Sequence, residues 1–185
     1  MRGFISFIDE MNTWIGKAFG WCVFALTFSV VIEIGARYFL NKPTLWVFDF
    51  SIQMYGAMFM MAGAYALVTQ SHVRADMLYR KAPIRFQASS DLILYFLFFF
   101  PACIAFTYTG FNYASKAWLL KETSWNSPAQ IQVYAFKSLI PMAGILLVLQ
   151  GISEVFRCVL ALKEGEWPVR FIEEEEIEKI LIKKK

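Results

Sequence analysis

The charged residues around the first apolar hairpin have spacings that suit ionic contacts. Glu33 and Arg37 are four residues apart, with the acid on the N-terminal side, which is the favoured order for an ion pair on one helix face. The stretch Asn41-Lys42-Pro43 predicts a turn, because Pro43 lacks an N–H. Asp49 then opens the next apolar segment, where the helix dipole favours a carboxylate. We predict that these three charges tie the end of a helical hairpin together, with Asp49 turned towards Arg37. The alternative is that each charge lies separately in the lipid headgroup layer.

The other chemically active residue types are sparse. His72 is the only histidine and lies at the edge of a loop, which excludes a haem held by two histidines and a Ser-His-Asp set. Cys22, Cys103 and Cys158 fall in three separate apolar segments without a CxxC pair, which indicates packed or lipid-facing thiols. No glycine-rich phosphate loop occurs in the sequence. We therefore expect no enzyme activity, and no catalytic residue, cofactor or metal site in this chain.

The composition is that of an integral membrane protein. Hydrophobic residues make up 58% of the chain and charged residues 18%, whereas soluble domains carry about a quarter charged residues. The net charge of +3 is small, and no basic stripe is evident, which argues against a nucleic-acid partner. The lipid bilayer is therefore the first partner that the sequence indicates.

Four apolar segments are long enough to cross a bilayer, which takes about 20 residues of helix. Backbone groups inside lipid must be satisfied within their own segment, so the spans must be helices. We expect an all-α integral membrane protein with spans at about residues 17–39, 45–71, 91–115 and 135–162. Residues 1–162 would form a single membrane domain, and residues 163–185 a charged tail.

The two ends of the chain differ in character. Apolar residues between Phe4 and Ile15 recur at helical spacing, with polar residues elsewhere on the wheel, which predicts an amphipathic helix lying in the membrane surface. A frayed cytosolic lead-in is the alternative. In the tail, Glu175 and Glu176 interrupt the apolar face that Ile172 begins, which favours a short solvated segment over a partner-docking helix.

Three local signals concern helix ends and bends. Pro101 and Pro141 lie inside the third and fourth spans and predict kinks, because proline lacks the N–H of the helical ladder. Residues 127–130 read Ser-Pro-Ala-Gln, a capping-box pattern with proline at the first helical position, and predict that a helix begins there.

Small residues recur at helical intervals within two of the spans. Gly56 and Gly63 are seven residues apart in the second span, and Gly144 and Gly151 repeat that spacing in the fourth. Small residues at such intervals let helices approach closely. The pattern fits helix packing within the chain and also a partner interface, and the two uses are compatible.

The distribution of Lys and Arg gives the orientation. If the N-terminus is inside, thirteen of the 18 Lys and Arg residues lie on the inner side. This assignment predicts that both termini and the loop 72–90 are cytoplasmic and that the loop 116–134 is outside.

The segment Arg37-Tyr38-Phe39-Leu40-Asn41-Lys42-Pro43, followed by Trp46, Asp49 and His72-Val73-Arg74-Ala75-Asp76, resembles the small membrane subunit of tripartite ATP-independent periplasmic (TRAP) transporters. The resemblance extends over about residues 30–157. The matching positions are Glu33, Arg37, Asn41, Pro43, Trp46, Asp49, His72, Arg74 and Asp76. The family often has one or two glutamates after the tryptophan, where this chain has Val47-Phe48-Asp49.

The resemblance implies an accessory role in the bacterial inner membrane. The partners would be a large membrane subunit that carries substrate and sodium, and a periplasmic substrate-binding protein. The complex would take up organic acids or related small solutes, and the resemblance assigns no catalytic residue to this chain. A free-standing channel or carrier is disfavoured because the acids lie towards span ends instead of the midplane. A membrane redox protein is disfavoured by the single histidine and the scattered cysteines.

Overall fold

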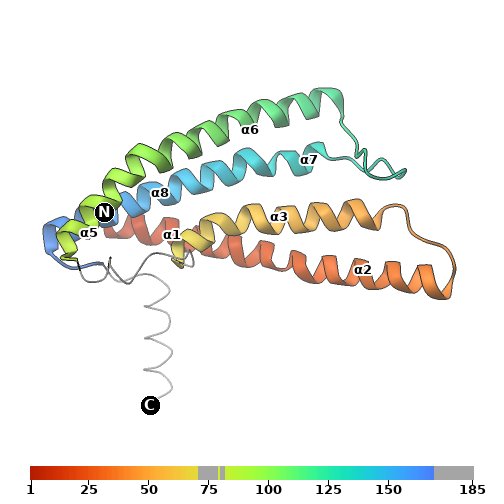
Figure 1. Ribbon diagram of the computed structural model, residues 1–185, viewed down its shortest axis with the longest axis horizontal. Coiled ribbons are helices and arrows are strands. Elements are labelled where there is room, and N and C mark those ends of the chain that lie inside the picture. The colour runs from red at the N-terminus through yellow and green to blue at the C-terminus, as the bar shows by residue number, and fades with distance from the viewer. Residues whose placement is uncertain (71–78, 80–81, 169–185) are drawn as a thin grey trace, which may run out of the picture. The chain divides into compact units, whose positions relative to one another are not determined.

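The described part of the chain is mostly helical (Figure 1). The computed structural model describes residues 1–70, 79 and 82–168. In chain order the helices are α1 (Arg2–Gly20), α2 (Cys22–Phe39), α3 (Val47–Val68), α5 (Ile84–Leu94), the π-helix η1 (Tyr95–Phe99), α6 (Phe100–Leu120), α7 (Tyr134–Lys137) and α8 (Leu139–Glu164). His72, Arg74 and Asp76 lie outside the described residues, as does the tail beyond residue 168.

Four of these helical segments have the length and apolar character to cross a membrane, which confirms the all-α membrane fold predicted from the sequence. They are Arg2–Phe39, Val47–Val68, Ile84–Leu120 and Tyr134–Glu164. The first and third contain 38 and 37 residues, or about 55 Å of helix each at 1.5 Å per residue. A hydrocarbon core is only about 30 Å thick, so both segments are longer than the core is thick.

The first segment is interrupted only at Trp21, where α1 gives way to α2. The predicted amphipathic helix is therefore longer than residues 4–15 and runs directly towards the predicted first span. Its position in the membrane surface stays a prediction.

A tight turn ends α2 and leads to α3. Asn41 adopts a left-handed backbone with φ of 51°, a conformation that asparagine tolerates better than most residues. The Lys42 N–H donates to the Ala36 carbonyl at 3.1 Å, and Pro43 then keeps the chain out of the helix before α3 begins at Val47. The turn lies where Asn-Lys-Pro predicts it.

The third segment changes its helical geometry just before Pro101. The π-helix η1 occupies residues 95–99, and the Phe100 N–H donates to the Tyr95 carbonyl five residues earlier. Proline has no N–H to donate to the hydrogen bonds of the helix. A π-helical turn is a local change in that hydrogen-bond pattern. The perturbation expected at Pro101 thus takes the form of a π-helical turn.

In the fourth segment the irregularity precedes the proline. The short helix α7 ends at Lys137, Ser138 forms a turn, and Pro141 is the third residue of α8. The first turn of a helix has no internal ladder bond for proline to break. At the other end, Gly165 takes a φ of 78° and its N–H donates to the Ala161 carbonyl at 2.9 Å, a glycine C-cap.

The chain divides into two compact units by its internal contacts. One unit comprises Met1–Trp14, Ala64–Ile104 and Leu146–Lys185, and its buried core is formed by Ala88, Tyr95, Cys158 and Ala161. The other comprises Ile15–Gly63 and Ala105–Ile145, and contains the α2–α3 hairpin and the loop between α6 and α7. The single domain expected for residues 1–162 stays a prediction.

Candidate functional site

Glu33 holds the turn between α2 and α3 together. Its Oε1 accepts a hydrogen bond from Arg37 Nη2 at 2.7 Å, and its Oε2 accepts one from the Thr44 N–H at 2.8 Å. The Thr44 hydroxyl also donates to Oε2. Thr44 lies beyond the turn, so one carboxylate joins the last turns of α2 to the residues that lead into α3. The predicted pair of Glu33 and Arg37 is present.

Asp49 does not pair with Arg37, and that part of the predicted tie is wrong. The Asp49 carboxylate is 2% exposed and accepts a hydrogen bond from the Ser124 hydroxyl at 2.6 Å and another from the Ser127 hydroxyl. The physical reason is that two hydroxyls of a distant loop reach the carboxylate in the first turn of α3, whereas Glu33 already satisfies Arg37. Asp49 therefore fastens the loop 121–133, the α6–α7 loop, to α3.

The α6–α7 loop is an ordered turn. Thr123 and Gln132 form an antiparallel bridge, and the Ser124 N–H donates to the Ile131 carbonyl at 2.7 Å. The helix predicted to begin at residues 127–130 is absent there, and the next helix, α7, begins at Tyr134. The capping-box prediction fails because the Ser127 side chain donates to Asp49 instead of capping a helix.

An ionic contact also holds the start of the α6–α7 loop. Lys137 Nζ lies 2.6 Å from Glu122 Oε2 and 4.0 Å from the centre of the Tyr113 ring. The lysine is 8% exposed, so its charge depends on these two partners in place of water. Side chains of α3 and α7 thus hold the first half of the loop, at residues 122, 124 and 127.

The other described motif residues of the α2–α3 hairpin shape the turn or pack beside it. Asn41 supplies the left-handed turn and Pro43 lies in the exposed loop. Trp46 is 43% exposed and lies edge-on to Phe50, with ring centres 5.9 Å apart. None of these residues contributes to a reactive group.

Three of the four glycines singled out in the sequence lie against side chains of the same chain. A Cβ on Gly56 would come 2.5 Å from the Phe136 ring, and one on Gly151 would come 2.5 Å from the Phe99 ring. A Cβ on Gly144 would overlap Thr107. Gly63 lies within α3.

The most buried polar cluster was not predicted from the sequence. Asp9 of α1 accepts hydrogen bonds from Gln150 Nε2 at 2.9 Å and from Ser153 Oγ at 3.2 Å, and it forms an ion pair with Arg157. Asn12 Nδ2 donates to Gln150 Oε1 at 2.7 Å. All five side chains are at most 2% exposed. The cluster joins α1 to α8 within the first unit.

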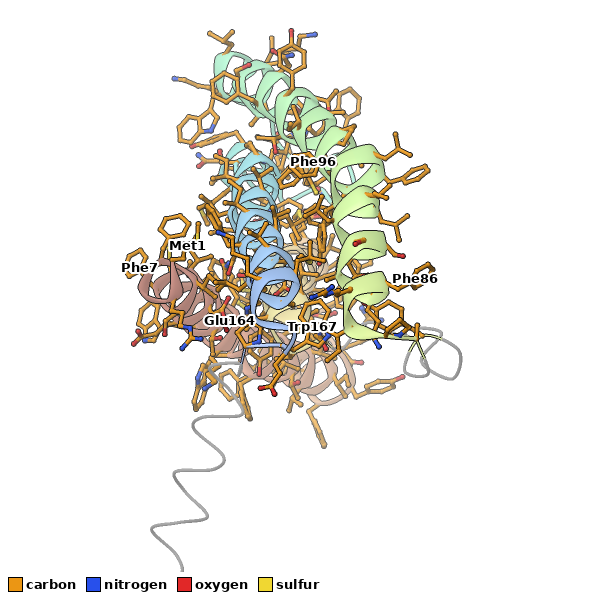
Figure 2. All side chains as sticks on the ribbon, turned by 90° about the vertical axis from the view of Figure 1, so that its left-hand side faces the viewer. Met1, Phe7, Phe86, Phe96, Glu164 and Trp167 are labelled. Carbon is orange, nitrogen blue, oxygen red and sulfur yellow. The ribbon has the colours of Figure 1, made fainter. Side chains whose placement is uncertain are left out.

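The polar residues of this cluster recur at helical spacing in both helices, although that spacing alone does not identify which faces pair. Residues 9, 12 and 13 of α1 are polar and fall on one helix face, as do residues 150, 153, 154 and 157 of α8. Within α8, Glu154 and Arg157 are three residues apart and form a local contact at 3.7 Å. The two polar faces contact each other, although Asn12 Oδ1 and Thr13 Oγ1 are buried without a hydrogen-bond partner among the described residues. Phe7, elsewhere on α1, is exposed and points outward (Figure 2).

Among the described residues no group of three or more His, Cys, Asp or Glu side chains is placed to hold a metal ion. The polar side chains that the structure brings together join helices and loops of this chain. They form structural clusters, and the exposed surface of the spans is mostly apolar.

These features define a four-span, all-helical membrane protein whose buried polar residues fasten its own elements. Residues 26–161 match the family model for the DctQ component of tripartite ATP-independent periplasmic transporters. The chain belongs to this family, as its motif residues indicate, and is a small membrane subunit of a TRAP transporter. A comparison with curated proteins finds no match.

Proposed function

We propose that this chain is the accessory scaffold of a sodium-coupled TRAP transporter for organic acids or related small solutes. It packs against the large transport subunit in the bacterial inner membrane, and a periplasmic substrate-binding protein delivers the substrate. Sodium binding and substrate translocation belong to the large subunit. Membership of the DctQ family supports the proposal, because that family is one component of a tripartite system.

The observation that carries the scaffold role is the contrast between buried polar side chains that contact one another within the chain and apolar helix faces that are exposed. In α2, Phe24, Phe28 and Val31 are 65%, 69% and 59% exposed. The intervals of four and three residues place these side chains on one helix face. Such a face suits lipid or a membrane partner, whereas a carrier would be expected to have polar groups or broken helices at the midplane.

A second apolar face runs along α6. Ile104, Tyr108 and Phe111 are each more than half exposed and repeat the same intervals. One of the two faces would contact the large subunit and the other would contact lipid. Substitutions that change side-chain size on the face that contacts the large subunit should then weaken assembly of the complex, because helix association within a bilayer depends on close packing.

Reconstitution into liposomes tests whether transport requires the large subunit and the binding protein. The isolated chain in liposomes with a sodium gradient should give no substrate uptake, and uptake should appear when the large subunit and the binding protein are added. Uptake by the isolated chain would replace the scaffold proposal with a free-standing carrier.

Photo-crosslinking from the two apolar faces tests the packing proposal. A photoreactive phenylalanine analogue at Phe28 and, separately, at Phe111 would be activated in membranes that contain the assembled complex. One position should capture the large subunit and the other should give lipid adducts. If neither position captures the large subunit, both faces contact lipid and the proposed packing surfaces are wrong.

A further inference from the structure

A pocket opens beside the α6–α7 loop at the end of α6. Its volume is about 750 Å³, and its lining includes Tyr113, Lys116 and Leu120 of α6 together with Lys121 and Trp125 of the loop. The three α6 residues are three and four positions apart, so the end of the helix forms one wall of the pocket. Figure 1 shows the loop continuing from α6 into α7.

The pocket carries a positive charge that the described part of the chain leaves unpaired. Lys116 and Lys121 are exposed, and neither forms an ion pair with a described residue. The one acid in the lining, Glu122, is paired with Lys137. The pocket therefore presents two lysine ammonium groups without a competing free carboxylate.

Polar and apolar groups share this lining. Thr123 and Gln130 add a hydroxyl and an amide, while Leu120 and Trp125 are 77% and 93% exposed. Leu119, next to the pocket, is 84% exposed. An apolar rim at the end of a helix long and apolar enough to cross a membrane suits headgroup depth, where tryptophan and lysine are favoured.

We propose that this pocket binds the phosphodiester headgroup of an anionic phospholipid. The two lysines attract the phosphate, the hydroxyl and the amide donate to its oxygens, and Leu120 and Trp125 contact the glycerol and the upper acyl chains. A phosphate ester fits better than an acidic protein segment, because the same lining supplies cations and a lipid-exposed apolar rim. The site requires no assumption about substrate, orientation or the large subunit.

The test uses the full chain in detergent micelles, titrated with phosphatidylglycerol or phosphatidylcholine and monitored by native mass spectrometry. Phosphatidylglycerol should bind more tightly than phosphatidylcholine. The double variant Lys116→Gln and Lys121→Gln should weaken phosphatidylglycerol binding on the order of tenfold. Substituting both lysines with arginine keeps the charge and should preserve the preference for phosphatidylglycerol.

A matched control separates this site from general surface charge. Lys42→Gln with Lys163→Gln removes the same charge from exposed positions elsewhere and should leave binding unchanged. An equal loss in both glutamine variants, or a loss in the arginine variant, would overturn the site. Glycerol phosphate binding as tightly as the lipid would assign the pocket to a free phosphate ester. If the variant Lys116→Gln with Lys121→Gln bound lipid normally but no longer captured the periplasmic binding protein, the pocket would be a protein contact. This result, like tight binding of glycerol phosphate, would overturn the lipid proposal.

Discussion

Asp9 in α1 and Arg157 in α8 form an ion pair in which the two side chains are 0% and 2% exposed. Gln150 and Ser153 donate to the same carboxylate, so the charge is satisfied without water. A buried pair of this kind is strongly destabilised when one partner is removed, because the other charge stays buried. The pair therefore fixes α1 against α8.

The first prediction concerns this pair. Arg157→Met should destabilise the chain by about 3–5 kcal/mol, because Asp9 keeps a buried carboxylate without its cation. The double variant Asp9→Leu and Arg157→Met should recover a large part of that loss. Thermal unfolding in detergent, arranged as a double-mutant cycle, measures both effects.

An exposed ion pair that joins the same two helices is the matched control. Arg2 and Glu164 pair at 2.8 Å with 73% and 42% of their side chains exposed. Arg2→Gln should cost at most about 1 kcal/mol. Equal losses from Arg2→Gln and Arg157→Met would mean that the burial of the Asp9 pair has no energetic effect.

The second prediction concerns the loop anchor at Asp49. Asp49→Leu leaves the Ser124 and Ser127 hydroxyls without their acceptor, and a hydrogen bond to a charged group contributes about 1.5–3 kcal/mol. Amide exchange in residues 121–133 should become at least about tenfold faster, while exchange in α8 stays unchanged. Ser124→Ala with Ser127→Ala should reproduce the effect, and unaltered exchange in both variants would contradict the anchor.

Assembly gives a second readout for the same variant. Asp49→Leu should reduce co-purification with the large subunit more than it alters substrate preference, because the change acts through loop order. A variant that assembles normally and transports a different substrate would place Asp49 on the transport path.

The third prediction contrasts two glycines. Gly144→Ala brings a Cβ against Thr107 and should destabilise the chain by about 1–3 kcal/mol through overpacking. Gly35→Ala, in the interior of α2, meets no atom within 4 Å and should stabilise by up to about 1 kcal/mol, because alanine favours helix. Thermal unfolding of the two variants should therefore shift in opposite directions, and a shared sign would contradict the close approach at Gly144.

The fourth prediction is the orientation. In a background where the three cysteines are replaced by alanine, Asn126→Cys should react with a membrane-impermeant thiol reagent on intact cells. Ala82→Cys should react only after permeabilisation, because it belongs to the loop predicted to be inside. Labelling of Ala82→Cys on intact cells would reverse the orientation.

Local signals predicted the helices well, because a bilayer leaves the backbone few choices. The α2–α3 turn followed from Asn41 and Pro43, whose backbone preferences act within two or three residues. The spans followed from apolar length alone. In both cases, residues close to one another in the sequence determine the structure that forms.

Long-range pairing was harder to predict. The pattern at Ser127 resembles a helix start, yet its hydroxyl donates to Asp49, 78 residues earlier in the chain. Asp9 appeared to belong to a surface helix and instead contacts Arg157, 148 residues away. A single sequence contains the polar faces but not their partners, so such contacts become visible only once the helices are packed.

The π-helical turn at Tyr95–Phe99 has a consequence for comparing this subunit with its relatives. A π-helix contains one residue more than the α-helix it replaces, and each helical residue turns the chain by about 100°. A relative whose third span is α-helical throughout would keep the same face of α5 buried only if its sequence were one residue shorter within the stretch that corresponds to residues 95–99. Sequence alignments through the third span should therefore place a single-residue gap between α5 and Pro101. Deleting one residue of η1 should convert the turn to α-helix and leave Ala88 in its buried position, whereas inserting a residue into α6 would not restore that register.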